Sequence, residues 1–281
     1  MDNERYLRWR DRKFGQSPAS IDELIVEVGD LHALTPGEHT AILDRCKRSN
    51  MAIYASRTID PDMRRFGRQF GLESLDANWL SGEDGVSRIA VSKDGQGYIP
   101  YTDRPIKWHT DGYYNPPERK IRAMLLHCVR SASLGGENRL MDHEILYCLL
   151  RDENPEYVRA LSEPDAMTIP ERMGEDHIAR KAETGPVFSF DSNENLHMRY
   201  TARTRSIAWK QDGITLAAMA AIETALSSPS PYIFHVKLEP GMGLICNNVL
   251  HDRAGFSDEA RLLYRARYYD RVGDIPVLPR P

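Results

Sequence analysis

The stretch Trp108-His109-Thr110-Asp111, together with a distant histidine, His251, decides how we interpret this chain. If residues 108–111 form an extended strand, residues two apart point to the same face of it. His109 and Asp111 would then present an imidazole nitrogen and a carboxylate oxygen to one point. A strand from elsewhere in the fold can bring His251, which follows 142 positions later (251 − 109), to that same point.

Two histidines and one carboxylate cover one face of a six-coordinate metal and leave the other positions open. This ligand set is typical of non-haem Fe(II) oxygenases. A His-x-Asp pair alone occurs by chance in many proteins, and three unrelated polar residues at a sheet edge are the alternative. The sequence after His251 favours the metal site, because Arg261 and Arg265 follow in a predicted strand, where core positions rarely carry arginine.

Length and composition are those of an ordinary globular protein. The chain has 281 residues, of which 41% are hydrophobic and 28% charged, and its formal net charge is −4. A chain of this length suits one large domain or two small ones. The charge balance argues against a nucleic-acid partner, and no apolar run is long enough to predict a membrane span. The four cysteines form no Cys-x-x-Cys pair and the N-terminus is charged, so we expect no signal peptide and a cytoplasmic location.

The first 75 residues or so predict a flanking α/β segment. Residues 1–20 are polar and basic and are expected to form an arm or a short helix. Thr35, Pro36 and Glu38 form a helix-start signature, which predicts a helix to about Asn50. The other elements expected here are a strand over Ile21–Val28, a short strand over Met51–Tyr54 and a helix within Asp60–Phe70.

The remainder, from about residue 76 to 281, predicts short strands and turns with a few helices, which indicates an α+β fold. Strands are expected over Ile121–Val129, Phe188–Phe190, Leu196–Tyr200, Tyr232–Leu238, Gly243–Cys246 and Arg261–Tyr269. Helices are expected over Asp142–Arg151, from Pro155, and over Gln211–Leu226. Residues 80–107 are expected to form a long loop. Residues 163–186 are punctuated by Pro and Gly and are expected to form a lid-like insertion.

Several motifs, in the right order between residues 98 and 270, resemble the taurine dioxygenase and γ-butyrobetaine hydroxylase superfamily. They are Tyr101–Asp111, Leu125-Leu126-His127-Cys128, Gly135-Gly136-Glu137-Asn138, Glu239-Pro240-Gly241, Asn247-Asn248, Leu250-His251 and Arg261. The first 70 residues match only loosely. Two residues depart from the pattern: the taurine branch has threonine where Asn138 stands, and the γ-butyrobetaine branch has an aromatic residue where Arg267 stands.

The resemblance implies one dioxygenase domain over residues 1–281, with a double-stranded β-helix (jelly-roll) core of the clavaminate synthase-like type and flanking helices. It implies Fe(II), 2-oxoglutarate and dioxygen, with release of succinate and CO2 and hydroxylation of a C–H bond. His109, Asp111 and His251 would be the iron ligands. Homodimers and homotetramers are common among such relatives.

The resemblance also assigns residues to 2-oxoglutarate. Arg261 would bind the distal carboxylate, since a guanidinium offers two parallel donors to a carboxylate. Asn138 would be a second donor. A structural salt bridge is the alternative for Arg261, and a purely conformational turn is the alternative for Asn138.

We expect the substrate to be a small anionic or zwitterionic metabolite. On a regular strand Arg265 and Arg267 share a face with Arg261, and three arginines in a dry core need anions; a bulge that carries one of them to solvent is the alternative. We predict substrate contacts for Arg265, Arg267, Tyr101 and Tyr113, although core or rim packing is the alternative for the tyrosines. A guanidinium would repel the trialkylammonium group of γ-butyrobetaine, so we expect that compound to be rejected.

Other polar residues near these motifs are expected to be structural. We expect Trp108 in the core, His127 and His235 as packed core histidines, and His143 at a helix start. Two other functional classes stay open: a catalytically inactive metal- and 2-oxoglutarate-binding sensor or binding protein, and a metal-free sugar-binding or storage jelly roll.

Overall fold

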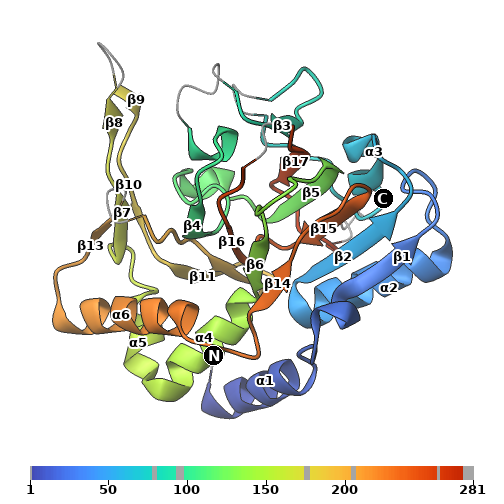
Figure 1. Ribbon diagram of the computed structural model, residues 1–281. Helices are drawn as coiled ribbons and strands as arrows, with labels where there is room; N and C mark the ends of the chain where they lie inside the picture. The colour runs from blue at the N-terminus through green and yellow to red at the C-terminus, as the bar shows by residue number, and fades with distance from the viewer. Residues whose placement is uncertain are drawn as a thin grey trace, which may run out of the picture.

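The computed structural model describes residues 2–77, 81–92, 98–173, 178–203, 207–257 and 260–274. A six-stranded and a four-stranded sheet form its centre, and helices cover the outer side of each sheet (Figure 1). Three smaller sheets of two or three strands lie beside this core. The described part of the chain therefore has the α+β composition that the sequence predicted.

The larger sheet has the strand order β1-β2-β15-β5-β17-β3. β1 and β2 pair in parallel, and the remaining neighbours pair antiparallel. Because β2 pairs with β15, the N-terminal segment supplies one edge of the main sheet. The strands are β1 (Ile25–Val28), β2 (Met51–Ser56), β15 (Met242–Cys246), β5 (Ala123–Arg130), β17 (Leu262–Tyr268) and β3 (Ser87–Ile89).

Helices α2 (Pro36–Ser49) and α3 (Met63–Arg68) cover the outer face of this sheet. α2 begins with the predicted capping box, in which Thr35 and Glu38 exchange hydrogen bonds. The strand expected over Ile21–Val28 is only half correct, because Ile21–Leu24 form a 3-10 turn, η1. Strand geometry begins at Ile25, where pairing with β2 begins.

The smaller sheet has the order β14-β6-β16-β4, with antiparallel neighbours throughout. Its strands are β14 (Phe234–Val236), β6 (Asn138–Met141), β16 (Leu250–Arg253) and β4 (Ile106–His109). Helices α4 (His143–Glu153), α5 (Pro155–Ala160) and α6 (Gly213–Ser227) pack on its outer side. The N-terminal residues form a regular helix, α1 (Asn3–Gly15), which packs on α4.

An apolar cluster fills the space between the two sheets. On β17, Leu263 belongs to this inner cluster, whereas Ala266 and Tyr268 belong to the outer one. Since side chains alternate along a strand, Arg265 and Arg267 point inward with Leu263. On the facing sheet, His251 is the register partner of Leu140, another inner residue. The inter-sheet space therefore receives the candidate histidines and arginines from opposite sides.

The region expected to be a lid-like insertion contains short strands. They are β7 (Met167–Ile169), β8 (Arg172–Met173), β9 (Ile178–Arg180) and β10 (Glu183–Gly185). β10 and β13 (Ala208–Trp209) flank β7, and β8 and β9 form a hairpin that projects from the body of the fold (Figure 1). Residues 174–177 lie outside the described part of the chain. The predicted hairpin around residues 191–195 is confirmed by β11 (Phe188–Phe190) and β12 (Leu196–Met198).

The loop expected over residues 80–107 is interrupted by β3, by the 3-10 turn η3 (Ile99–Tyr101) and by the start of β4, and its residues 80 and 93–97 are not described. A further 3-10 turn, η4 (Pro117–Arg119), follows β4. None of the helices in the described ranges combines the length and the apolar character that a membrane span requires.

Candidate metal centre and cosubstrate site

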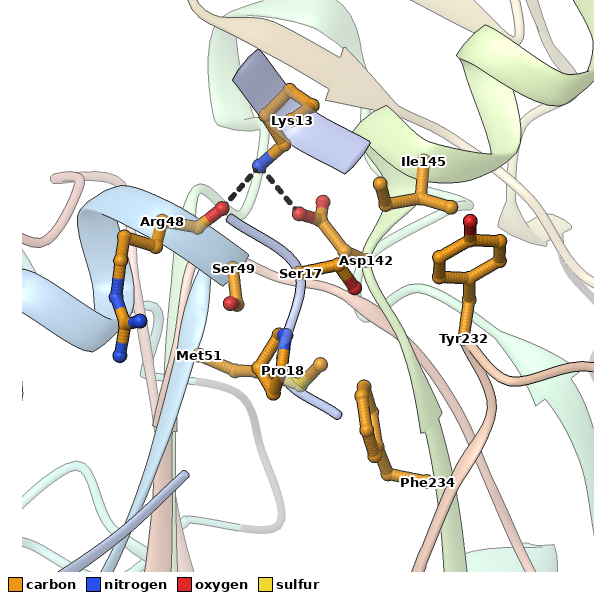
Figure 2. Close-up of a pocket in the computed structure, with 10 residues that line it drawn as sticks. All are labelled: Lys13, Ser17, Pro18, Arg48, Ser49, Met51, Asp142, Ile145, Tyr232 and Phe234. Carbon is orange, nitrogen blue, oxygen red and sulfur yellow. Dashed lines mark hydrogen bonds and ion pairs between the residues drawn. The ribbon is translucent and has the colours of Figure 1, made fainter. Parts of the chain in front are cut away.

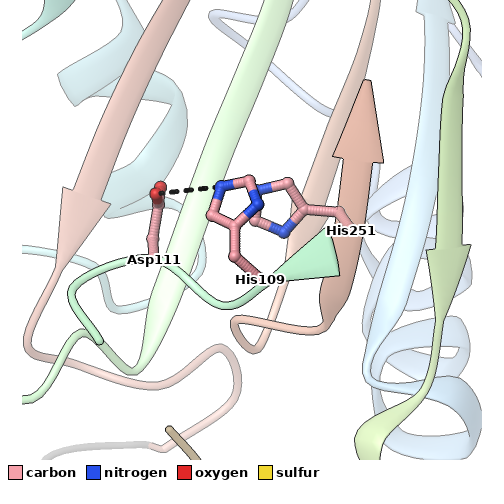
Figure 3. Close-up of side chains that lie close together, drawn as sticks. All are labelled: His109, Asp111 and His251. Atoms are coloured by element: carbon pink, nitrogen blue, oxygen red, sulfur yellow. Dashed lines mark ion pairs between the residues drawn. The ribbon is translucent and has the colours of Figure 1, made fainter. Parts of the chain in front are cut away.

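The two histidines face each other across a strand pair. His109 ends β4 and is the direct register partner of His251 on β16, and their ring centroids are 4.2 Å apart (Figure 3). Nε2 of His109 lies 4.0 Å from Oδ1 of Asp111. One potential ligand atom from each of the three residues lies within 4.8 Å of the others. The fold therefore brings together residues that are 142 positions apart in the chain (251 − 109).

Both imidazoles are oriented by backbone carbonyls. Nδ1 of His109 lies 2.9 Å from the carbonyl oxygen of Lys107, and Nδ1 of His251 lies 2.9 Å from that of Val249. A carbonyl oxygen only accepts hydrogen bonds, so each Nδ1 carries a proton, and in the neutral form of each ring the lone pair is on Nε2. Burial and the neighbouring His251 lower the pKa of His109 to about 3. Both rings are thus suited to bind a metal through Nε2.

Asp111 supplies a buried anionic ligand. Burial alone would raise the pKa of its carboxyl group, but the charges of Arg265 and Arg267 hold that pKa below its usual range. Oδ1 lies 3.4 Å from Nη1 of Arg265, and Oδ2 is buried without a hydrogen-bond partner among the described residues. An unpaired buried carboxylate oxygen is costly unless a cation or donor meets it. The donor set of two imidazoles and one carboxylate therefore fits a divalent metal ion.

Asp111 reaches this position by a different route from the one predicted. β4 ends at His109, so Asp111 lies on a turn and not on the same strand. The turn is tied to Tyr200 by Thr110, whose amide donates to the Tyr200 carbonyl over 3.0 Å. Gly112 follows with a φ of +67°, and a Cβ there would lie 2.4 Å from Cγ1 of Ile121. Only glycine fits this left-handed position without displacing Ile121.

Asn248, in the turn between β15 and β16, holds the backbone of Asp111. Its Oδ1 accepts from the Asp111 amide over 2.7 Å, and its Nδ2 donates to the Asp111 carbonyl over 2.9 Å. Nδ2 also donates to the Ile121 carbonyl over 2.7 Å. We predicted no role for Asn248; the signal in the sequence was an Asn-Asn pair three positions before the second histidine, since Asn adopts left-handed turn conformations more readily than most residues.

Arg261 is a buried cation whose guanidinium N–H groups are available to a ligand. It immediately precedes β17, is 5% exposed, and stacks on Phe256 with its guanidinium carbon 5.0 Å from the ring centroid. A Cβ on Gly136 would lie only 3.2 Å from its Nε. In the described ranges we find no carboxylate or carbonyl bonded to this guanidinium, and burial lowers its pKa. The salt bridge that was the alternative role for Arg261 is not found there.

Asn138 lies on β6 beside β16, on the face that His251 occupies. Its Nδ2 donates to the Asp252 carbonyl over 2.6 Å, and its Oδ1 is buried without a partner among the described residues. One of the two amide hydrogens is therefore used within the sheet, and the other can serve a ligand. Its role as a second donor to 2-oxoglutarate stays a prediction.

Arg265 and Arg267 differ in their partners although both point inward. Arg265 contacts Asp111, and its Nε is buried without a partner among the described residues. Arg267 is ion-paired with Asp76 and donates to the Tyr114 hydroxyl over 3.0 Å. Asp76 is itself buried and also accepts from Arg119 over 2.8 Å. Asp76 was not predicted, and it neutralises Arg267, whereas Arg265 faces the candidate metal ligands.

The tyrosines predicted to contact substrate lie in two places. Tyr101 is buried among the inner apolar residues, with a hydroxyl that has no partner in the described part of the chain. Tyr113 packs edge-on against Tyr114 at 5.1 Å between ring centroids. The guanidinium of Arg180, from β9, also lies over the Tyr114 ring, 5.7 Å from the ring centroid. Their contact with substrate stays a prediction.

Most of the polar residues expected to be structural are confirmed as such. Trp108 is buried, and its indole donates to the Leu226 carbonyl over 3.1 Å. His127 is fully buried between Tyr54 and the Ile59 carbonyl, and His143 begins α4. The prediction for His235 is wrong, because this residue points outward on β14 and is exposed.

Residues 59–267 match the sequence profile described as "Taurine catabolism dioxygenase TauD, TfdA family". A curated relative, uridine-5'-phosphate dioxygenase from Amycolatopsis sp, is 33% identical over 174 residues, which is 57% of this chain and 60% of the relative. The alignment thus spans less than two thirds of that relative's length.

Two solved structures have similar folds. The non-haem iron oxygenase OrfP, in complex with Fe, succinate and (3S)-hydroxy-L-Arg, has a TM-score of 0.62 at 16% identity over 86% of this chain and 82% of OrfP. Asparagine oxygenase, in complex with Fe(II), 2S,3S-3-hydroxyasparagine and succinate, has a TM-score of 0.61 at 13% identity over 86% of this chain and 81% of that one. Since the family match alone covers 209 of the 281 residues (267 − 59 + 1), the chain belongs to the TauD, TfdA family of taurine catabolism dioxygenases.

Proposed function

We propose that this chain is an Fe(II)- and 2-oxoglutarate-dependent dioxygenase that hydroxylates a small polar substrate and releases succinate and CO2. The observation that carries the proposal is the convergence of His109, Asp111 and His251 on one point, where Oδ2 of Asp111 is buried without a hydrogen-bond partner among the described residues. Family membership supports it. Iron bound by these residues would activate dioxygen together with 2-oxoglutarate for C–H hydroxylation.

Arg261 is the residue we assign to the distal carboxylate of 2-oxoglutarate. Its buried guanidinium lies against Phe256 and Gly136, and it has no protein anion among the described residues. A buried cation of this kind needs an anion to offset its desolvation. Asn138 would add a donor from the neighbouring strand.

The substrate we propose is anionic or zwitterionic, and Arg265 is the residue we expect to meet its negative group. Arg265 lies against Asp111, whereas the charge of Arg267 is already balanced by Asp76. We expect Tyr101 and Tyr113 to form apolar walls. The relative from Amycolatopsis is named for a substrate that carries a phosphate group, and this supports an anionic substrate.

For the fold, we propose one domain whose two facing sheets form a double-stranded β-helix. The pairing of β2 with β15 supports a single domain, because the N-terminal segment is part of the main sheet. The inner cluster shared by both sheets supports the same assignment. The hairpin formed by β8 and β9 would be part of a lid over the substrate.

The test is succinate formation from 2-oxoglutarate in air with Fe(II) and ascorbate, using a panel of amino acids, sulfonates, carboxylates and nucleotides, with γ-butyrobetaine as the compound expected to fail. We expect one class to stimulate succinate release, and Asp111→Ala to abolish both iron binding and turnover. His235→Ala is the matched control, because this exposed histidine lies on the same sheet as His251. If the protein binds iron and 2-oxoglutarate but turns over no compound, the result would instead favour the sensor. If it binds no iron, both the dioxygenase and the sensor would be excluded.

A further inference from the structure

The turn that carries Asn248 is held from both sides. Asn248 bonds the amide and the carbonyl of Asp111, as described above, and has a left-handed φ of 51°. Its neighbour Asn247 points the other way. The Asn247 amide donates to the Asn50 carbonyl over 2.7 Å, and its Nδ2 donates to Oδ1 of Asn50 over 3.2 Å. The position of Asp111 is thus connected, through one turn, to Asn50 at the end of α2.

Asn50 is buried, and hydrogen bonds hold its side chain in place. It caps α2 with a left-handed φ of 57° and is 1% exposed. Its Nδ2 donates to Oδ1 of Asp142 over 2.9 Å, and its Oδ1 accepts from Nη2 of Arg271 over 2.6 Å. Asp142 in turn caps the N-terminus of α4, because Oδ1 accepts from the Glu144 amide over 2.9 Å. Each amide atom of the Asn50 side chain therefore has an assigned partner.

Lys13 of the N-terminal helix closes the network. Its ammonium group is 2.6 Å from Oδ2 of Asp142 and 2.7 Å from the Arg48 carbonyl (Figure 2). It is also 2.8 Å from Oε2 of Glu144. Lys13 is 3% exposed. A lysine buried to this degree is rare unless it is paired, and the two carboxylates would be costly to bury without it. The ammonium group of Lys13, on α1, thus fixes the side chain of Asp142, which in turn orients Asn50.

We propose that Lys13, Asp142, Asn50, Asn247 and Asn248 form one buried polar chain that positions Asp111 for metal binding. The inference rests on the proposed function, and it gives the N-terminal helix a role in the metal site. Asp111 lies beyond the end of β4, so Asn248 takes the place of a strand partner for its backbone. The other members fix the rotamer and backbone of the turn. They are positioning residues, because none of them touches the metal ligand atoms.

The first experiment removes the direct support. Asn248→Gly deletes all three side-chain bonds but keeps the left-handed backbone, which glycine adopts freely. Partners that orient a ligand typically change metal affinity by about 10- to 100-fold, so we expect the dissociation constant for Fe(II), measured anaerobically by competition with a chelator, to rise by at least ~10-fold. Glu194→Gly is the matched control, because Glu194 also has a positive φ of 63° but lies in the β11–β12 turn.

The second experiment tests the end of the polar network at Lys13. Lys13→Met keeps most of the side-chain volume and removes the charge, and we expect a smaller loss of Fe(II) affinity, about three- to tenfold, since the effect passes through several residues. Tyr6→Phe is its control, because it weakens the docking of α1 on α4 by removing the Tyr6 hydroxyl bond to Asp152 without touching the network. Asn50→Gly serves in place of Lys13→Met if that variant does not fold. All affinities are measured at a temperature where circular dichroism shows each variant folded.

The outcomes separate this inference from the proposed function. If the wild-type protein does not bind Fe(II), the proposed function fails and the inference fails with it. If the wild type binds Fe(II) and Asn248→Gly binds it equally well, the positioning role is refuted while the proposed function stands. If Lys13→Met (or Asn50→Gly in its place) has no greater effect on Fe(II) affinity than Tyr6→Phe, the network does not extend to the N-terminal helix.

Discussion

Arg261 and Arg267 are both buried arginines on the same chain segment, yet replacing each by methionine should have opposite consequences. Arg261 is 5% exposed and has no protein anion among the described residues, so Arg261→Met removes an unpaired buried cation. Arg267 is 4% exposed and pairs with Asp76, so Arg267→Met leaves a buried carboxylate with one partner fewer. The first variant should keep or gain thermal stability, and the second should lose it.

The magnitudes follow from these partners. Loss of a buried charge-assisted contact to a ligand costs about 2–5 kcal/mol, which at 1.4 kcal/mol per tenfold corresponds to a rise of about 30-fold to several thousand-fold in the dissociation constant for 2-oxoglutarate. Breaking one side of a buried ion pair costs about 3–5 kcal/mol of folding free energy. The Asp76 pair should lie at the low end of that range, because Arg119 and Tyr269 still donate to Asp76.

The assay is a titration of the anaerobic Fe(II) protein with 2-oxoglutarate, combined with urea unfolding of the protein without metal. We expect Arg261→Met to lose 2-oxoglutarate binding with an unfolding free energy at or above that of the wild type. We expect Arg267→Met to be destabilised. If Arg261→Met binds 2-oxoglutarate as the wild type does, the assignment of Arg261 is wrong, and Arg265 is the next residue to replace.

Three further predictions concern the turn, a core histidine and the substrate side. Gly112→Ala should destabilise the protein by about 1–3 kcal/mol in urea unfolding and weaken iron binding, because alanine is strained at positive φ and its Cβ would meet Ile121; wild-type behaviour would refute the steric argument. Burial lowers the pKa of His127 below its unfolded value of 6.5, so the unfolding free energy should decrease as pH falls below 6.5. His127→Gln should make this decrease smaller, and an unchanged dependence on pH would refute the assignment. Arg265→Met should reduce substrate-stimulated succinate release, and unchanged stimulation by an anionic substrate would assign the substrate's charge to another residue.

The local elements and the identity of the candidate ligands could be predicted from sequence alone. The helix that Thr35 caps was predictable because its capping box lies within four residues. The hairpin around residues 191–195 was predictable for the same reason, since its turn residues are adjacent in the chain. The His-x-Asp pair and the later histidine were recognisable because their residue types and order carry the chemistry.

Which polar residues contact one another depends on the tertiary fold. The sequence pattern placed Asp111 on a strand with His109, but its position depends on Asn248, 137 residues away. The sequence assigned equal roles to Arg265 and Arg267, but Asp76, 191 residues from Arg267, neutralises only one of them. The network of Lys13 and Asp142 joins residues 129 apart. Such contacts depend on strand register and helix docking, which are set by packing across the whole fold. They therefore cannot be inferred from the local periodicity of the sequence.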